Sequence, residues 1–252
     1  MLFQEAKMRF PTSRLPALVF VLALACTGLF LNGCQWGDCI NGKGSVSKQL
    51  LTLDAFHGVA SSGSLDIRFY KGTEQRVEVE GQPNLIELIP TEVKDGIWHL
   101  ERTACYSTSE RFVVHITSPR IDHVAMHGSG EAKSKDTYTV DQATLQLHGS
   151  GGIEMSFDTD RLQATVQGSG DLRVQGRCNT LEAQVQGSGD IDAGKLICTD
   201  VDALVQGSGD ITVWATGTLN ATVQGSGDIN YKGQPAELKD HVAGSGRIKT
   251  IK

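Results

Sequence analysis

The chain has 252 residues, of which 39% are hydrophobic, and it carries a formal net charge of −6 at pH 7. This length allows one elongated domain or two small ones. An acidic balance with no basic stripe argues against nucleic acid as a partner. Aromatic residues make up 6% of the chain and glycine occurs 29 times, which fits a fold with many tight corners.

Residues 1–33 have the pattern of a secretory signal peptide. Three basic residues come first, at Lys7, Arg9 and Arg14. An apolar run then extends from Leu15 to Leu31, and small residues follow it. A charged start, an apolar middle and a small-residue end describe an export signal rather than an element of the fold.

The apolar run ends in Leu31-Asn32-Gly33-Cys34, which resembles a bacterial lipobox. We therefore expect acylation of Cys34, which would anchor the mature protein in a membrane and leave residues 34–49 as a tether. An aspartate directly after the acylated cysteine would favour retention in the inner membrane, but Gln35 occupies that position. We therefore expect the protein to be anchored in the outer membrane, on its periplasmic or surface face. The same run also fits four alternatives: an ordinary cleaved signal peptide, an uncleaved membrane anchor, cleavage before Cys26, or translation that starts at Met8.

Residues 50–119 are predicted to form a β-rich lobe. Stretches such as Leu65–Tyr70 and Phe112–Thr117 alternate apolar and polar residues, which is the period of a half-buried strand. Residues 84–90 fit either a short helical turn or another strand. Residues 61–67 resemble a corner that is repeated further along the chain, so we expect the lobe to consist of wider coils that close one end of the fold.

Residues 120–252 contain seven copies of Gly-Ser-Gly at a period close to 20 residues. The copies begin at Gly128, Gly149, Gly168, Gly187, Gly207, Gly225 and Gly244. Apolar and polar residues alternate on both sides of each copy, as they do over residues 162–167 and 171–174. This alternation predicts two short strands that meet at a glycine-rich corner. A fixed period of this length is typical of a solenoid.

Equivalent apolar positions line up when the copies are superposed. One column is Met126, Leu147, Val166, Val185, Val205, Val223 and Val242. A second is Ala132, Ile153, Leu172, Ile191, Ile211, Ile229 and Ile248, and a third, of small residues, is Ala164, Ala183, Ala203 and Ala221. We therefore predict an all-β fold, a single-stranded parallel β-helix of about six to seven coils stacked roughly 4.8 Å apart. The general bias of parallel connections favours right-handed coils.

Four cysteines follow the proposed acylation site. An even count in an oxidising compartment predicts two disulfides. Cys178 and Cys198 each lie nine residues before a Gly-Ser-Gly copy, so they occupy the same position in adjacent coils. The spacing of coils suits the Cα separation of a disulfide, and Cys178–Cys198 is therefore predicted. Cys39–Cys105 follows by elimination.

Four motifs, taken in order, are similar to the head GIN domain family. They are Gly81-Gln-Pro-Asn-Leu-Ile, the stretch from Glu92 to Leu100, the stretch from Val114 to Ile121, and the Gly-Ser-Gly-Asp-Ile coils. The resemblance covers roughly residues 50–250. It implies an all-β fold like a β-helix and a location in the cell envelope, and it implies no catalytic residues and no cofactor.

Two polar columns accompany the corners. The acidic column is Asp171, Asp190, Asp210 and Asp228. Like charges roughly 4.8 Å apart cost only about 0.9 kcal/mol in water, so these residues fit solvated turns, and a weak contact with a cation or sugar is the alternative. The amide column is Gln167, Gln186, Gln206 and Gln224, with His127 and His148 before it. Stacked amides predict a structural ladder, and we predict no metal site.

These patterns predict a non-enzymatic lipoprotein of the cell envelope. Its rigid β-helix would present a long polar face to an envelope protein or a polysaccharide. The alternative is a carbohydrate-active β-helix, such as a polysaccharide lyase that uses the acidic column with calcium. The short return loops favour the first interpretation, because lyases build their clefts from long loops.

Overall fold

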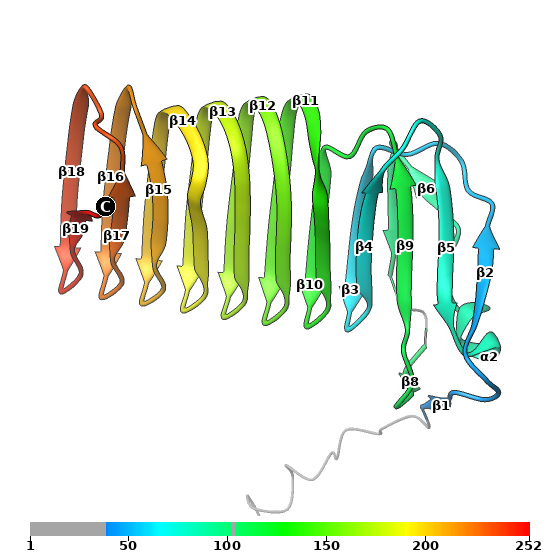
Figure 1. Ribbon diagram of the computed structural model, residues 1–252. Coiled ribbons are helices and arrows are strands. Elements are labelled where there is room, and N and C mark those ends of the chain that lie inside the picture. Colours follow the sequence, from blue (N-terminus) through cyan, green and yellow to red (C-terminus); the bar gives the residue numbers. More distant parts are fainter. Residues whose placement is uncertain (1–38, 102–103) are drawn as a thin grey trace, which may run out of the picture. The chain divides into compact units, whose positions relative to one another are not determined.

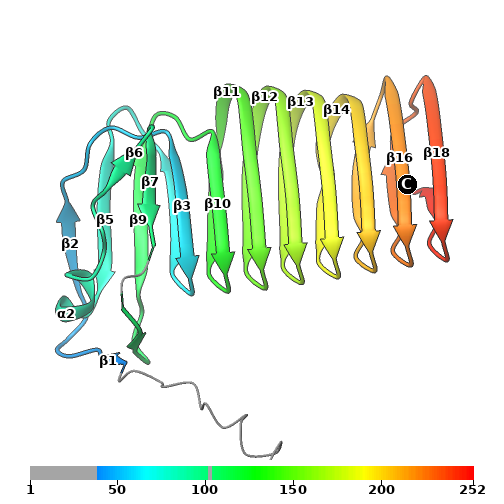
Figure 2. The same ribbon diagram turned by 180° about the vertical axis from the view of Figure 1, so that it is seen from behind.

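A computed structural model describes residues 39–101 and 104–252, and Figures 1 and 2 show it from opposite sides. The predicted signal peptide, the acylation site Cys34 and the first part of the tether lie outside these residues. The described chain is almost entirely β-structure, as predicted. Within it, the one helix is α2, Pro83–Ile86, where the sequence allowed either a helical turn or a strand.

The lobe comprises nine strands before the continuous coils begin. They are β1 Ile40–Asn41, β2 Ser47–Leu51, β3 Gly58–Gly63, β4 Asp66–Lys71, β5 Arg76–Gly81, β6 Val93–Lys94, β7 Ile97–Leu100, β8 Tyr106–Ser107 and β9 Val113–Ser118. The coils are β10 His123–Gly128, β11 Glu131–Gly149, β12 Gly152–Gly168, β13 Asp171–Gly187, β14 Asp190–Gly207, β15 Ile211–Ala215, β16 Thr218–Gly225, β17 Ile229–Lys232, β18 Glu237–Gly244 and β19 Ile248–Thr250.

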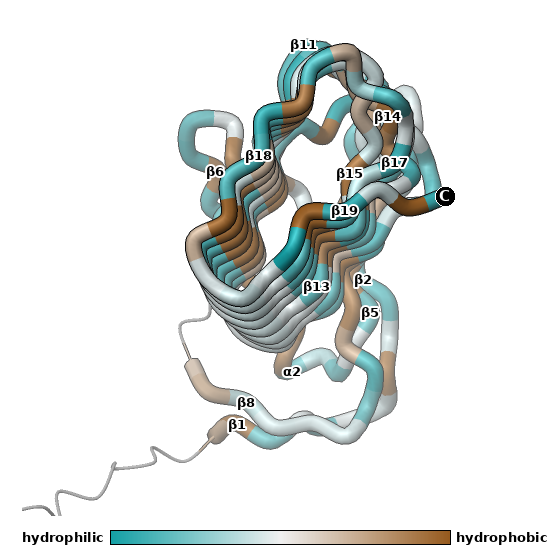
Figure 3. Tube along the Cα trace, turned by 90° about the vertical axis from the view of Figure 1, so that its left-hand side faces the viewer, coloured by the Kyte–Doolittle hydropathy of each residue, from teal (hydrophilic) through white to brown (hydrophobic). Residues whose placement is uncertain are grey.

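Successive coils pair in parallel and in register, which confirms the predicted β-helix. Gly149 pairs with Gly168, and Gly168 pairs with Gly187. The two predicted apolar columns and the column of small residues lie inside the coil, and their members from β12 to β16 are at most 3% exposed. Figure 3 looks along the stack and shows the corners superposed. Each coil therefore completes the hydrophobic interior of its neighbours.

The corners require glycine because each one lies directly against the corner before it. Gly168 has φ +130°, a conformation that residues with a side chain rarely adopt. The carbonyl oxygen of Gly149 accepts hydrogen bonds from the backbone N–H groups of Ser169 and Gly170, both at 2.9 Å. A Cβ atom on Gly168 would lie 2.4 Å from that oxygen. The repeat thus preserves a close contact between the backbones of adjacent coils.

The lobe continues the same stack before its topology changes. Strands β3 and β4 pair in parallel with β10 and β11, and Gly63 pairs with Gly128. Residues 61–67 therefore form the first corner, as the sequence suggested. The expectation of wider coils holds for β7 and β9, which pair in parallel with β3 and β4. It is wrong for β2, β5 and β6, whose pairings are antiparallel. Residues 72–75 reverse the chain between β4 and β5, and residues 95–96 reverse it between β6 and β7.

Two disulfides link positions far apart in the sequence, and both are the predicted pairs. Cys178–Cys198 joins β13 to β14 with a Cα–Cα distance of 4.7 Å. Cys39–Cys105 lies beside the short parallel pair of β1 and β8, with the same Cα–Cα distance. In the part of the chain that the structure describes, no helix is long and apolar enough to cross a bilayer.

Candidate functional site

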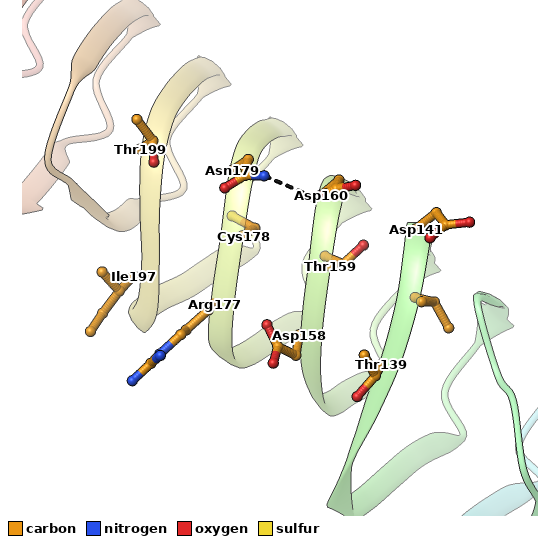
Figure 4. A pocket seen from close by; sticks show the side chains of 11 residues that line it. Thr139, Asp141, Asp158, Thr159, Asp160, Arg177, Cys178, Asn179, Ile197 and Thr199 are labelled. Atoms are coloured by element: carbon orange, nitrogen blue, oxygen red, sulfur yellow. Dashed lines mark hydrogen bonds between the residues drawn. The ribbon is translucent and has the colours of Figure 1, made fainter.

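A polar groove of about 490 Å³ crosses several coils (Figure 4). Three rows of residues form it. One exposed row is Thr139, Asp158, Arg177 and Ile197, and the other is Asp141, Asp160, Asn179 and Thr199. The floor between them is Val140, Thr159 and Cys178. We call this set of residues the polar groove.

The coil geometry explains why the rows are regular. Thr139 pairs with Asp158, Asp158 with Arg177, and Arg177 with Ile197. Because neighbouring rungs of a sheet are about 4.8 Å apart, each row presents one side chain at that interval along the stack. Every floor residue alternates with its exposed neighbours, so its side chain is turned toward the coil interior.

The chemistry of the polar groove changes along its length. Three carboxylates, those of Asp141, Asp158 and Asp160, lie toward the lobe. Arg177 follows them, and Ile197, which is 41% exposed, ends the row. Apart from the bond between Asn179 Nδ2 and Asp160 Oδ1, at 2.8 Å, the charged groups of the groove have no partner among the described residues. These groups are free to bind a ligand.

The disulfide Cys178–Cys198 fixes the floor of the polar groove. Cys178 is 5% exposed and Cys198 is 1% exposed, so the bridge lies just under the surface. Thr159 precedes Cys178 in the same row and donates its hydroxyl hydrogen to the backbone oxygen of Arg161, at 3.2 Å. The bridge and the ladder hydrogen bonds hold the exposed rows at fixed separations, so little conformational entropy remains to be lost on binding.

The acidic column lies at the corners, away from the polar groove, and most of its carboxylates bind the protein itself. Asp190 Oδ1 accepts the backbone N–H of Asp210 at 2.8 Å, and Asp210 Oδ1 accepts that of Asp228 at 2.7 Å. Asp228 Oδ1 accepts the N–H of Arg247 at 2.9 Å. Each carboxylate thus satisfies a backbone donor of the next corner, as a capping side chain does.

The two ends of the acidic column also carry ion pairs. Asp171 pairs with Arg173 at 2.9 Å. Asp228 is 9% exposed and contacts Arg247 at 2.9 Å and Lys249 at 3.1 Å. Hydrogen bonds from those two cations lower the pKa of Asp228. Within residues 39–101 and 104–252, no three His, Cys, Asp or Glu side chains converge as a metal site would require.

The amide column forms the predicted ladder over its C-terminal part. Gln186 Nε2 donates to Gln206 Oε1 at 3.2 Å, and Gln206 Nε2 donates to Gln224 Oε1 at 2.9 Å. Toward the lobe, the rings of His127 and His148 stack with centroids 4.6 Å apart. Burial, followed by the charge of His127, lowers the pKa of His148. This face is occupied by contacts between coils.

A family model matches residues 55–235, described as "Putative auto-transporter adhesin, head GIN domain". The chain belongs to this family. The match spans the lobe and most of the coils, so the polar groove lies inside the GIN domain. A search of curated proteins finds no match to the chain.

Solved structures of bacterial proteins share this fold. A putative adhesin from Bacteroides fragilis is 26% identical with a TM-score of 0.80, and the alignment covers 84% of this chain and all of that one. A putative adhesin from Parabacteroides merdae is 22% identical with a TM-score of 0.68, covering 86% and 100%. A putative lipid binding protein from Parabacteroides distasonis is 23% identical with a TM-score of 0.70, covering 85% and 100%.

Sequence analysis of the GIN domain missed the polar groove, although the signal was present. The residues Thr139, Asp158, Arg177 and Ile197 each lie ten residues before a Gly-Ser-Gly copy. The same offset argument identified Cys178 and Cys198. The groove was missed because its rows vary in residue type, and a column that varies is harder to see than one of repeated aspartates.

Proposed function

We propose that this protein is a non-enzymatic, adhesin-like lipoprotein of the cell envelope whose polar groove binds a glycan chain. The observation that carries the proposal is the set of unpartnered polar side chains, among them Asp158 and Arg177, on a scaffold of paired rungs. The volume of the groove lies within the range of roughly 300–1,000 Å³ that ligand sites occupy. The names of the similar solved structures, adhesins and a lipid binding protein, also favour binding over catalysis.

The lining of the groove favours a hydroxyl-rich chain over a lipid. An acyl chain needs an apolar cavity, and the polar groove offers carboxylates, hydroxyls, an amide and a guanidinium. The apolar cavity of the lobe, beside Leu85 and Phe112, has a volume of about 10 Å³. That space holds about one water molecule. A linear glycan running along the stack could repeat its contacts from rung to rung.

The exposure of the groove favours binding over acid–base catalysis. A general acid needs a carboxyl group that burial or a nearby charge keeps protonated. Asp141, Asp158 and Asp160 are exposed, and the groove does not enclose its ligand. The lyase interpretation relied on the acidic column, where Asp190 and Asp210 already accept backbone hydrogen bonds. Incubation with uronic-acid polymers, with and without a chelator, tests that alternative directly.

Glycan binding is tested with the full chain on an array of acidic and neutral polysaccharides. We expect binding that Asp158→Ala and Arg177→Ala each weaken by about tenfold, because each removes a charged hydrogen-bonding group. The matched control is Glu182→Ala, which removes an exposed charge from β13 outside the groove and should leave binding unchanged. Equal binding by all three variants, or no binding by the wild type, would refute the proposal.

The anchor is a separate part of the proposal and has its own test. Cys34 ends the lipobox-like sequence, and the described part of the chain begins five residues later, at Cys39. We expect cells that express the full chain to incorporate labelled palmitate into it, and we expect Cys34→Ala to abolish the label and release the protein from membranes. Fractionation of inner and outer membranes would then locate the anchored protein. Palmitate labelling that persists in Cys34→Ala would contradict the prediction that Cys34 carries the lipid anchor.

A further inference from the structure

The last coil leaves one end of the stack open. Among the described strands, β18 pairs with β16 alone and β19 pairs with β17 alone. Leu238 and Val242 of β18 are each 41% exposed, whereas their register partners Leu219 and Val223 are fully buried. An eight-residue strand with an unpaired edge and an uncovered apolar face is a template for another strand.

One residue departs from the column pattern at this open end. Asp240 pairs with Ala221, which continues the small column through Ala203 and Ala183. Alternation along the strand therefore directs the carboxylate of Asp240 to the inner face, between Leu238 and Val242. Asp240 has no hydrogen-bond or ion-pair partner among the described residues, and it is exposed.

A second copy of the chain presents the same edge, so the natural pairing is antiparallel, β18 against β18. The register that covers Leu238 with Val242 of the second copy also places Asp240 opposite Asp240 of the second copy. Residues directly opposite in an antiparallel pair have Cβ atoms about 4.5–5.5 Å apart. Pairing would thus bring two carboxylates together while removing water from both, and neither would have a cation beside it.

Other charges near the edge do not relieve this clash. Lys239 and Glu237 pair with each other at 2.9 Å on the outer face of β18. Arg247 and Lys249 are held by Asp228. On the lobe side, the strands with one partner are β2, which has five residues, and β1, β6 and β8, which have two each. Strand β18 is therefore the longest described strand that has a single partner.

We propose that Asp240 keeps the open end of the β-helix from pairing with a second copy of the chain. An inward-pointing charge is one of the devices by which edge strands avoid edge-to-edge association. The residue thus protects an edge at which the apolar columns of the repeat would otherwise favour the addition of another strand. This proposal is independent of what the polar groove binds.

The test measures the oligomeric state of the full chain, solubilised in detergent, by sedimentation velocity over a range of concentrations. We expect wild type to be monomeric and Asp240→Ala, which restores the residue of the column, to form dimers with a dissociation constant lower by roughly a hundredfold or more. The control is Lys239→Ala, which alters the outer face of the same strand and should stay monomeric. Circular dichroism checks that each variant folds.

A charge-reversal experiment tests the register itself. Asp240→Lys alone should remain monomeric, because two lysines would face each other. An equimolar mixture of wild type and Asp240→Lys should form heterodimers, because the opposed charges then attract. A dimeric wild type, a monomeric Asp240→Ala, or a mixture that fails to associate would each overturn the proposal.

Discussion

Substituting Gly187 by alanine tests whether the corners lie one directly above another. Gly187 has φ +126°, and a Cβ atom there would lie 2.4 Å from the carbonyl oxygen of Gly168. That oxygen accepts the N–H groups of Ser188 at 2.8 Å and Gly189 at 2.9 Å. The positive φ alone costs about 1–3 kcal/mol in a residue with a side chain. Weakening two hydrogen bonds adds about 0.5–1.5 kcal/mol each, so we expect a loss of about 2–6 kcal/mol in the free energy of unfolding.

The assay is urea unfolding of the oxidised protein, followed by far-ultraviolet circular dichroism. Ser188→Ala is the matched control, because its side chain is exposed in the same corner and its loss should change stability by no more than about 0.5 kcal/mol. A loss for Gly187→Ala below about 1 kcal/mol, or one equal to that of the control, would refute the reasoning that stacked backbones exclude a side chain there.

Three further predictions concern single columns of the stack. Tyr138 is fully buried and its hydroxyl has no partner among the described residues, so Tyr138→Phe should raise stability by about 1 kcal/mol, and a lower melting temperature would contradict this. Replacing Cys178 and Cys198 together by alanine should cost about 3 kcal/mol for a loop of 20 residues, whereas an unchanged urea midpoint would rule out a contribution from the bridge. Because the pKa of His148 is lowered in the folded state, the unfolded chain takes up protons first, and stability should fall as pH drops through about 6.5. His148→Gln should reduce this acid sensitivity, measured as melting temperature between about pH 7 and pH 5, and an unaltered pH profile would count against it.

The repeat made the coils predictable, because a fixed period exposes which positions share a column. The alternation around Gly168 and the equal offsets of Cys178 and Cys198 were enough to set the register and one disulfide. The antiparallel strands of the lobe were not predictable in the same way. Strands such as β5 alternate like any half-buried strand, and alternation does not tell parallel from antiparallel pairing.

The candidate site was less predictable than the fold. The acidic column drew attention because aspartate recurs there, yet the structure shows that Asp190 and Asp210 hold neighbouring corners together. The polar groove lies between two exposed rows that flank a less exposed one. A one-dimensional pattern shows the alternation of Asp158, Thr159 and Asp160, but it does not show that the two exposed rows line a common space.

The parallel register of the stack has a consequence for how such a chain could lengthen or shorten during evolution. Consecutive corners, such as those at Gly168 and Gly187, present matching upper and lower surfaces. A duplicated segment of one period would therefore insert a complete rung that fits both neighbours, and a deletion of one period would close without a gap. The length of the β-helix can therefore change by whole coils, while the residues on each face of the stack keep the same arrangement.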